Sequence, residues 1–110
     1  MPPQLDLDRL SQSFAALARH QDWTSLHSPK NLACALAVEA GELLSLFQWQ
    51  SDAVNHKLAT APPTAAVAAE LADIVLYANA LADCLEIDLP AAIERKCEAN
   101  AQRLGLYDGN

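Results

Sequence analysis

Two apolar stretches of the chain each carry a pair of carboxylates at helical spacing. Glu39 and Glu42 are three residues apart in the first stretch, and Glu70 and Asp73 are three apart in the second. This spacing places both members of a pair on neighbouring positions of one helix surface. Burying a carboxylate is costly unless it is paired or binds a metal ion. Any fold proposed for this sequence must therefore explain the two acidic pairs.

Apolar periodicity and capping residues predict four helices and no strand. In the first helix, for example, Leu7, Leu10, Phe14 and Leu17 recur at spacings of three and four. The predicted helices span about 6–20, 29–51, 64–86 and 89–103, with a break at about 52–64. The predicted N-terminal caps are Asp6, Ser28 and either Asp88 or Leu89, with Pro29 and Pro90 in first turns. With 110 residues, we expect a single domain over 1–110 with a core at about 6–103, folded as an all-α, four-helix bundle-like subunit.

Helical wheels place the acidic pairs away from the polar faces of their helices. Opposite Glu39 lie the polar residues Lys30, Ser45, Gln48 and Asp52, which predict a solvent face. Opposite Glu70 lie Asn79, Asp83 and Glu86, which predict a second one. Asp73 and Tyr77 share the Glu70 side. The same departure from an apolar interior thus occurs on two helices independently.

Inward-facing carboxylates predict a bound divalent cation. Four such acids would repel one another, and lysine and arginine number only seven in the whole chain. Oxygen ligands without cysteine or histidine suit Mg²⁺ or Mn²⁺, and Mg²⁺ commonly also binds substrate phosphates. A solvated helix face is the alternative for each single pair. A di-iron site would need Glu-x-x-His motifs, and His20, His27 and His56 all lie outside such a motif.

Two aromatic residues are predicted to stand beside the acids. Trp49 follows Glu42 by two helical turns, and Tyr77 follows Asp73 by one. Both residue types also fill ordinary cores. Next to a phosphate-binding metal, however, flat rings would hold a nucleobase by stacking.

Composition excludes several other classes of function. The formal net charge of −7 argues against a nucleic-acid polymer as partner. Charged residues interrupt every apolar run before it reaches the roughly 18 residues of a membrane span, so no membrane association is expected. The acidic, polar N-terminus does not resemble a signal peptide, and the three cysteines lack metal-ligand spacing. We therefore expect a cytoplasmic protein.

The acidic motifs resemble those of a known family. E-A-G-E at 39–42 and E-L-A-D at 70–73 match the E-x-x-E and E-x-x-D signature of the MazG-like all-α nucleoside triphosphate pyrophosphatases. The flanking segments are similar to the dCTP pyrophosphatase branch; they read DWTSLHSPKNL, AVEAGELLSLFQW, ELADIVLYANALA and IDLPAAIERKCEANAQR. Together they cover most of residues 20–103.

The resemblance implies an activity and a set of site residues. It implies Mg²⁺-dependent hydrolysis of a nucleoside triphosphate between its α and β phosphates, giving a monophosphate and pyrophosphate. The implied metal ligands and catalytic residues are Glu39, Glu42, Glu70 and Asp73. The implied substrate-binding residues are Trp23, His27, Trp49, Tyr77, Lys96 and Asn100, with Arg103 as a weaker candidate.

The resemblance also implies association, which the apolar faces of the two central helices favour independently. We expect a homodimer or homotetramer with a pocket built partly across the subunit contact. The expected substrate is dCTP or a modified pyrimidine deoxynucleotide. A dUTPase-like or other nucleotide preference remains an alternative. A non-enzymatic oligomerising helical module would be the other class of function.

Overall fold

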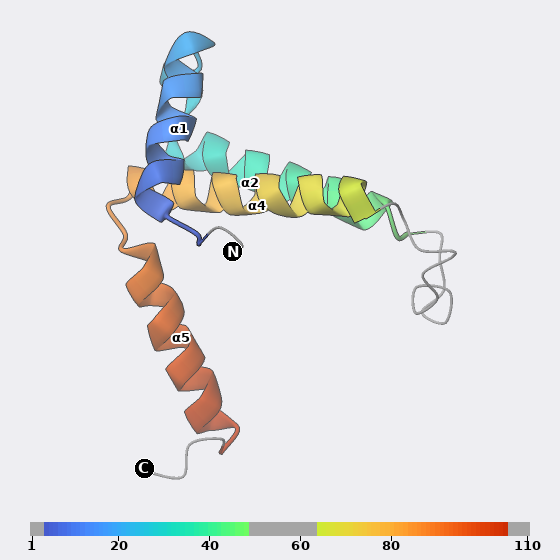
Figure 1. Cartoon of the computed structure of the whole chain (residues 1–110), viewed down its shortest axis with the longest axis vertical. Coiled ribbons are helices and arrows are strands. Elements are labelled where there is room, and N and C mark those ends of the chain that lie inside the picture. The colour runs from blue at the N-terminus through green and yellow to red at the C-terminus, as the bar shows by residue number, and fades with distance from the viewer. Residues whose placement is uncertain (1–3, 49–63, 106–110) are drawn as a thin grey trace.

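The computed structural model describes residues 4–48 and 64–105, apart from the Leu26 side chain. Trp49, Asp52 and most of the predicted break therefore lie outside the described residues. The described helices are α1 (Leu7–His20), the 3₁₀ helix η1 (Thr24–Leu26), α2 (Pro29–Ser45), α4 (Thr64–Cys84) and α5 (Leu89–Arg103) (Figure 1). The described segments contain no strand. The all-α class and the four predicted helices are confirmed.

The helix starts follow the capping residues of the sequence. The carboxylates of Asp6 and Asp88 accept hydrogen bonds from the backbone N–H groups three residues later, each at 3.1 Å. The Ser28 hydroxyl accepts one from Asn31 at the same distance. Each cap contributes about 1 kcal/mol by satisfying a helix-end donor. Of the two candidates for the last helix, Asp88 is the cap and Leu89 is the first helical residue.

The prediction that α2 extends to residue 51 is wrong, because the helix ends at Ser45. The Ser45 hydroxyl donates a 2.6 Å hydrogen bond to the Glu42 carbonyl, which a continuing helix would offer to the N–H of Leu46. Leu46 instead donates to Leu43, and Phe47 to Leu44, which is the tighter spacing of a 3₁₀ turn. A local side-chain hydrogen bond thus competes with the helix and ends it.

Helices α1 and α4 end in the same Schellman motif. Asp22 and Glu86 have positive φ angles of 59° and 56°. The residues after them, Trp23 and Ile87, donate to the carbonyls five positions earlier, at 2.7 and 2.8 Å. This left-handed turn ends α4 two residues before the predicted position 86. It also fixes the backbone of Trp23 directly after α1.

Helices α2 and α4 run antiparallel and side by side, and α1 crosses them near the start of α2 and the end of α4 (Figure 1). The most buried apolar residues are Ala18 of α1, Leu32 of α2, and Ala80 and Ala82 of α4. Small alanine side chains let packed helices approach closely. Helix α5 leaves the end of α4 and points away from the other helices (Figure 1). Within one chain the bundle therefore consists mainly of α1, α2 and α4.

The prediction that Asn79 faces solvent is wrong. Its side chain is only 4% exposed and contacts α1. The Asn79 amide donates hydrogen bonds to Ser11 Oγ at 3.0 Å and to the Leu7 carbonyl at 3.4 Å. Helix α4 is covered on two sides, by α2 and by α1, so the polar residue opposite Glu70 is buried as well. Asp83 and Glu86, further along, are exposed as predicted.

Among the described helices, α4 is long and apolar enough to cross a membrane by length and composition alone. The core helix of a soluble protein passes the same test. Helix α4 also carries Glu70, Asp73 and Asn79, and charged side chains at the centre of a bilayer are costly. A single helix of this length and composition is therefore only weak evidence for a membrane span.

Candidate metal centre

Three of the four predicted acids converge between α2 and α4. Glu39 comes from α2, and Glu70 and Asp73 come from adjacent turns of α4. Each offers one carboxylate oxygen, and these three oxygens all lie within 4.8 Å of one another. All three residues are half-buried. The helical spacing within each pair and the antiparallel packing of the helices together create this acidic cluster.

The cluster is electrostatically unfavourable without a cation. The pKa of Glu39 is raised by a side-chain hydrogen bond with Glu70, by burial, and by the negative charges of Glu70 and Asp73. Glu70 Oε2 is buried and has no hydrogen-bond partner among the described residues. Buried polar atoms are almost always satisfied in native proteins. The orphaned oxygen and the crowded charges mark a place where a positive ligand would be stabilising.

The donor set fits a hard divalent cation. It consists of carboxylate oxygens from two rigid helices, without histidine or cysteine, which suits Mg²⁺ or Mn²⁺. No lysine or arginine of the described segments forms an ion pair with these acids, so no protein cation replaces the metal. The structure fits the metal prediction for Glu39, Glu70 and Asp73, and the identity of the ion stays a prediction.

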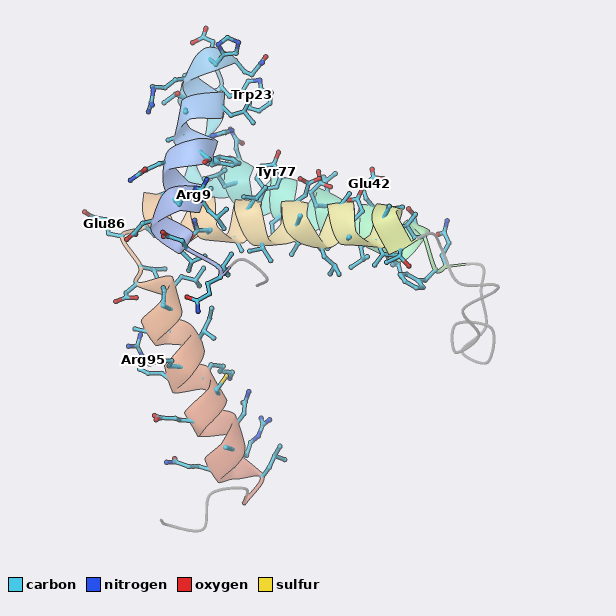
Figure 2. The ribbon with its side chains drawn as sticks, viewed as in Figure 1. Arg9, Trp23, Glu42, Tyr77, Glu86 and Arg95 are labelled. Atoms are coloured by element: carbon cyan, nitrogen blue, oxygen red, sulfur yellow. The ribbon has the colours of Figure 1, made fainter. Side chains whose placement is uncertain are left out.

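Glu42 is not part of the three-acid cluster. It lies one turn further along α2 and is exposed on the same edge of the helix pair as Tyr77 (Figure 2). Three residues separate it from Glu39, so the two side chains occupy neighbouring positions on one surface. Its role as a ligand or catalytic residue stays a prediction.

The pH dependence of cation binding is a direct consequence of the raised Glu39 pKa. A proton held by the carboxyl group competes with the cation, so the affinity for Mg²⁺ should fall as the pH drops through the raised pKa. The folding stability of the metal-free protein changes with pH in the opposite direction. A raised acid pKa favours the folded state most below the ordinary carboxyl range, and this stability is lost as the pH rises through the folded-state value.

Thermal unfolding with Mg²⁺ and with EDTA measures this coupling. We expect the Mg²⁺-induced rise in Tm to be larger at about pH 7.5 than at about pH 5, where Glu39 retains more of its proton. The Glu39→Gln variant should lose most of the difference between the two pH values. An equal Mg²⁺ effect at both pH values in the unaltered protein would contradict the coupling.

A row of aromatic side chains begins one helical turn from Asp73. Tyr77 follows Asp73 by four residues, about 6 Å along α4. The Tyr77 ring contacts Phe14 of α1, with centroids 5.7 Å apart and an edge-to-face angle of 78°. Phe14 contacts His27 at 5.3 Å, and His27 contacts Trp23 at 6.2 Å. Three residues predicted for the nucleotide pocket therefore belong to one row of rings; Trp49, the fourth aromatic, lies outside the described residues.

The two predicted pocket residues of α5 are not brought to this site within one chain. Lys96 is exposed and Asn100 is half-buried on a helix that points away from the α2–α4 pair (Figure 1). Arg95, their neighbour on α5, likewise lies far from Glu42 and Tyr77 (Figure 2). If these residues act at the acidic cluster, they act from a second copy of the chain.

Sequence reasoning leaves one residue of this region undecided and misplaces another. Phe14 belongs to the apolar stripe of the first helix, and the resemblance does not decide whether it contributes to the pocket; in the structure its ring connects His27 to Tyr77. Asn79 was assigned to solvent, yet it anchors α1. The available signal for Asn79 was a lone amide in a helix that is apolar almost all round, where a polar side chain needs a partner.

The fold and the cluster define a class: an all-α protein whose central helix pair presents carboxylates for a divalent cation. The sequence model of the MazG-like family matches residues 34–110 of the chain. The chain belongs to the MazG-like family. The resemblance carried by the acidic motifs is thereby confirmed.

Curated relatives extend the comparison over the N-terminal helix. The dCTP pyrophosphatase 1 of Rattus norvegicus is 44% identical over 107 residues, which cover 96% of this chain and 61% of the relative. That of Homo sapiens is 40% identical over 103 residues, covering 93% of this chain and 59% of the relative. The chain thus spans about three fifths of the length of the curated relatives it matches.

A solved structure shows the same architecture. A pyrophosphatase from Archaeoglobus fulgidus DSM 4304 aligns with a TM-score of 0.74 at 28% identity. The alignment covers 94% of this chain and 95% of that one. The whole arrangement of helices, including the outward α5, is therefore similar to that of a chain of comparable length.

Proposed function

We propose that the protein is a divalent-cation-dependent nucleoside triphosphate pyrophosphohydrolase. It cleaves between the α and β phosphates and releases a nucleoside monophosphate and pyrophosphate. The observation that carries the proposal is the cluster of Glu39, Glu70 and Asp73, whose oxygens lie within 4.8 Å of one another. The names of the similar proteins, dCTP pyrophosphatase 1 and a pyrophosphatase, support the same reaction class.

The acids of the helix pair perform the metal-binding part of this function. Glu39, Glu70 and Asp73 would hold the cation, Mg²⁺ or Mn²⁺, with Glu42 as the predicted fourth acid. When bound, such an ion polarises phosphate oxygens and lowers the pKa of a coordinated water. The helices hold the acids in place, because each acid is attached to a helix whose backbone is hydrogen-bonded from turn to turn. One of the acids can also accept the proton of the attacking water.

The aromatic row supplies the binding surface for the nucleobase. Tyr77 lies one turn from Asp73, so a base held at the rings would place its triphosphate beside the acids. Stacking on an aromatic ring contributes about 1–3 kcal/mol per base and discriminates little between bases. His27 adds polar ring nitrogens that can read a base edge. We propose dCTP or a modified pyrimidine deoxynucleotide as the substrate, in keeping with the names of the relatives.

The active form is a homo-oligomer, a dimer or tetramer, in which a second copy completes the site. Lys96 and Asn100 of α5 would reach the acidic cluster of the other chain, where Lys96 would offset phosphate charge. Two observations support association. The Cα radius of gyration is 17.2 Å, against about 13 Å for a compact domain of this length. Large apolar side chains on α4, such as Leu71 and Val75, are 49% and 44% exposed in the single chain.

Two alternatives follow from the same fold. A dUTPase-like or other nucleotide preference would use the same acids with a different set of base contacts. A non-enzymatic helical module would require the acids to form ion pairs at an interface. The chain has seven lysines and arginines against fourteen acids, and none in the described segments pairs with the cluster. The charge balance therefore favours the enzyme. The cytoplasmic location stays a prediction.

A nucleotide panel tests the proposal. The purified chain is incubated with dCTP, dUTP, dTTP, CTP and a 5-methyl-dCTP probe, with Mg²⁺ or with EDTA, and the products are separated by ion-exchange chromatography. We expect monophosphate and pyrophosphate from at least one pyrimidine deoxynucleotide, and no turnover in EDTA. Release of diphosphate and orthophosphate, or equal turnover in EDTA, would contradict the proposed reaction.

A further inference from the structure

Phe14 occupies a central place among the aromatic side chains. Its ring lies 5.3 Å from the His27 ring in a tilted arrangement, at an interplanar angle of 30°. It meets Tyr77 edge to face at 5.7 Å. Trp23 contacts His27, and Tyr77 belongs to a different helix. Among the described residues, Phe14 is thus the ring that connects the Trp23–His27 group after α1 with Tyr77 on α4.

The position of Phe14 is fixed by a polar contact one helical turn away. Ser11, three residues before Phe14 on the same side of α1, accepts a 3.0 Å hydrogen bond from the Asn79 amide. Asn79 follows Tyr77 by two residues on α4. Because the amide is buried and hydrogen-bonded to α1 at two points, α1 cannot slide along α4 without breaking these bonds. The same register brings Phe14 onto Tyr77.

We propose that Phe14 is a positioning residue of the nucleobase pocket, which holds the His27 and Tyr77 rings in a single wall. This inference rests on the proposed nucleotide-binding function. By packing against the imidazole, Phe14 limits the ways in which the His27 ring can turn toward a base. By meeting Tyr77 edge to face, it holds the phenol ring beside the turn that carries Asp73. Phe14 itself contributes no hydrogen bond to the base.

Three substitutions at Phe14 separate positioning from simple packing. Phe14→Leu keeps an apolar side chain but removes the ring, Phe14→Ala removes the side chain, and Phe14→Tyr retains the ring. Leu17→Ala is the matched control, because Leu17 lies on α1 and its side chain is 47% exposed. Calorimetry in Mg²⁺ compares the affinity for dCMP, which contains the base, with that for inorganic pyrophosphate, which does not.

We expect Phe14→Leu and Phe14→Ala to weaken dCMP binding about 10-fold, the loss of aromatic contacts to two rings. The KM for the substrate should rise similarly with little change in kcat, while pyrophosphate binding stays unchanged. Phe14→Tyr should bind dCMP nearly as well as the unaltered protein, and Leu17→Ala should not affect either ligand. The His27 ring-proton NMR signals, shifted by the nearby Phe14 ring, should move in Phe14→Leu and stay in place in Leu17→Ala.

Two results would overturn the inference. Unchanged dCMP affinity in Phe14→Leu would show that the ring does not position the pocket. Equal losses of dCMP and pyrophosphate affinity would show a general structural role. Failure of the proposed function is recognised separately, because the unaltered protein would then neither bind dCMP nor hydrolyse any nucleotide of the panel. The NMR comparison of Phe14→Leu with Leu17→Ala reports on the His27 contact even if Phe14→Ala does not fold.

Discussion

Replacing Glu70 with glutamine is expected to abolish Mg²⁺-dependent hydrolysis and, in EDTA, to make the protein more stable. Removal of a residue that only supports a metal ligand typically costs 10- to 100-fold in affinity or activity, so loss of a ligand itself should lower kcat/KM by at least about 100-fold. The gain in stability follows from the three carboxylate oxygens within 4.8 Å, since the substitution removes one charge from a repulsive cluster. A gain of about 1 kcal/mol would raise the Tm by about 4 °C in a domain of this size.

Loss of activity combined with a gain of stability in EDTA would distinguish a metal site from a structural ion pair. A structural ion pair would lose stability when one acid is neutralised, whereas a metal site without its metal gains stability. Glu39→Gln and Asp73→Asn should behave like Glu70→Gln, with the helical circular dichroism intact. Glu94→Gln, on the exposed part of α5, is the matched control and should alter neither activity nor Tm. Full activity in any cluster variant would remove that acid from the mechanism, and a lower Tm in EDTA would contradict the repulsion.

The helix boundaries show how far local sequence rules reach. Asp6, Ser28 and Asp88 start their helices as capping chemistry predicts, because each cap involves only residues three positions apart. The end of α2 was missed for an equally local reason. Ser45 and the Glu42 carbonyl form a bond that competes with the helix, and apolar periodicity contains no information about it.

The acidic cluster was predictable because two independent helices show the same anomaly. Each wheel places its acids away from an evident polar face, and the antiparallel packing of α2 and α4 brings these faces together. The membership of the cluster was not predictable. Whether Glu42 joins Glu39 depends on the rotation and register of α2 against α4, which the contacts between the two helices decide.

Asn79 and Phe14 show where wheel reasoning fails in physical terms. A wheel assigns one buried face and one solvent face, whereas α4 is covered by α2 on one side and by α1 on another. Asn79 therefore looks like a surface residue in the sequence and is 4% exposed in the fold. Phe14 contacts His27 and Tyr77, which lie on two other segments of the chain. The apolar pattern of its own helix cannot predict either contact.

Introducing charge on the outer face of α4 is expected to prevent association and, with it, activity. Leu71 and Val75 line an apolar groove of about 410 Å³ with Leu5, Leu10 and two further α4 side chains, Ala72 and Leu76. Both Leu71 and Val75 are nearly half exposed in the single chain, so Leu71→Asp with Val75→Asp should be tolerated by the isolated fold. If a second copy covers the groove, two buried unpaired charges should weaken association by at least about 100-fold. Light scattering at micromolar concentration should then report a monomer, where the unaltered protein gives a dimer or tetramer.

The control for this surface is Gln12→Asp, which adds a charge to an exposed position of α1 outside the groove and should leave the assembly unchanged.

Mixing two inactive variants then tests whether two copies of the chain share one active site. Glu70→Gln lacks a cluster acid, and Lys96→Ala lacks the cation of α5. In a mixed oligomer, one site combines an intact cluster from one chain with an intact α5 from the other, so part of the activity should return after the two proteins are exchanged. An unaltered protein that is monomeric, or a mixture that stays inactive although mixed oligomers form, would contradict the shared site. Lys96 would then have to act, if at all, within its own chain, from a helix that points away from the acids.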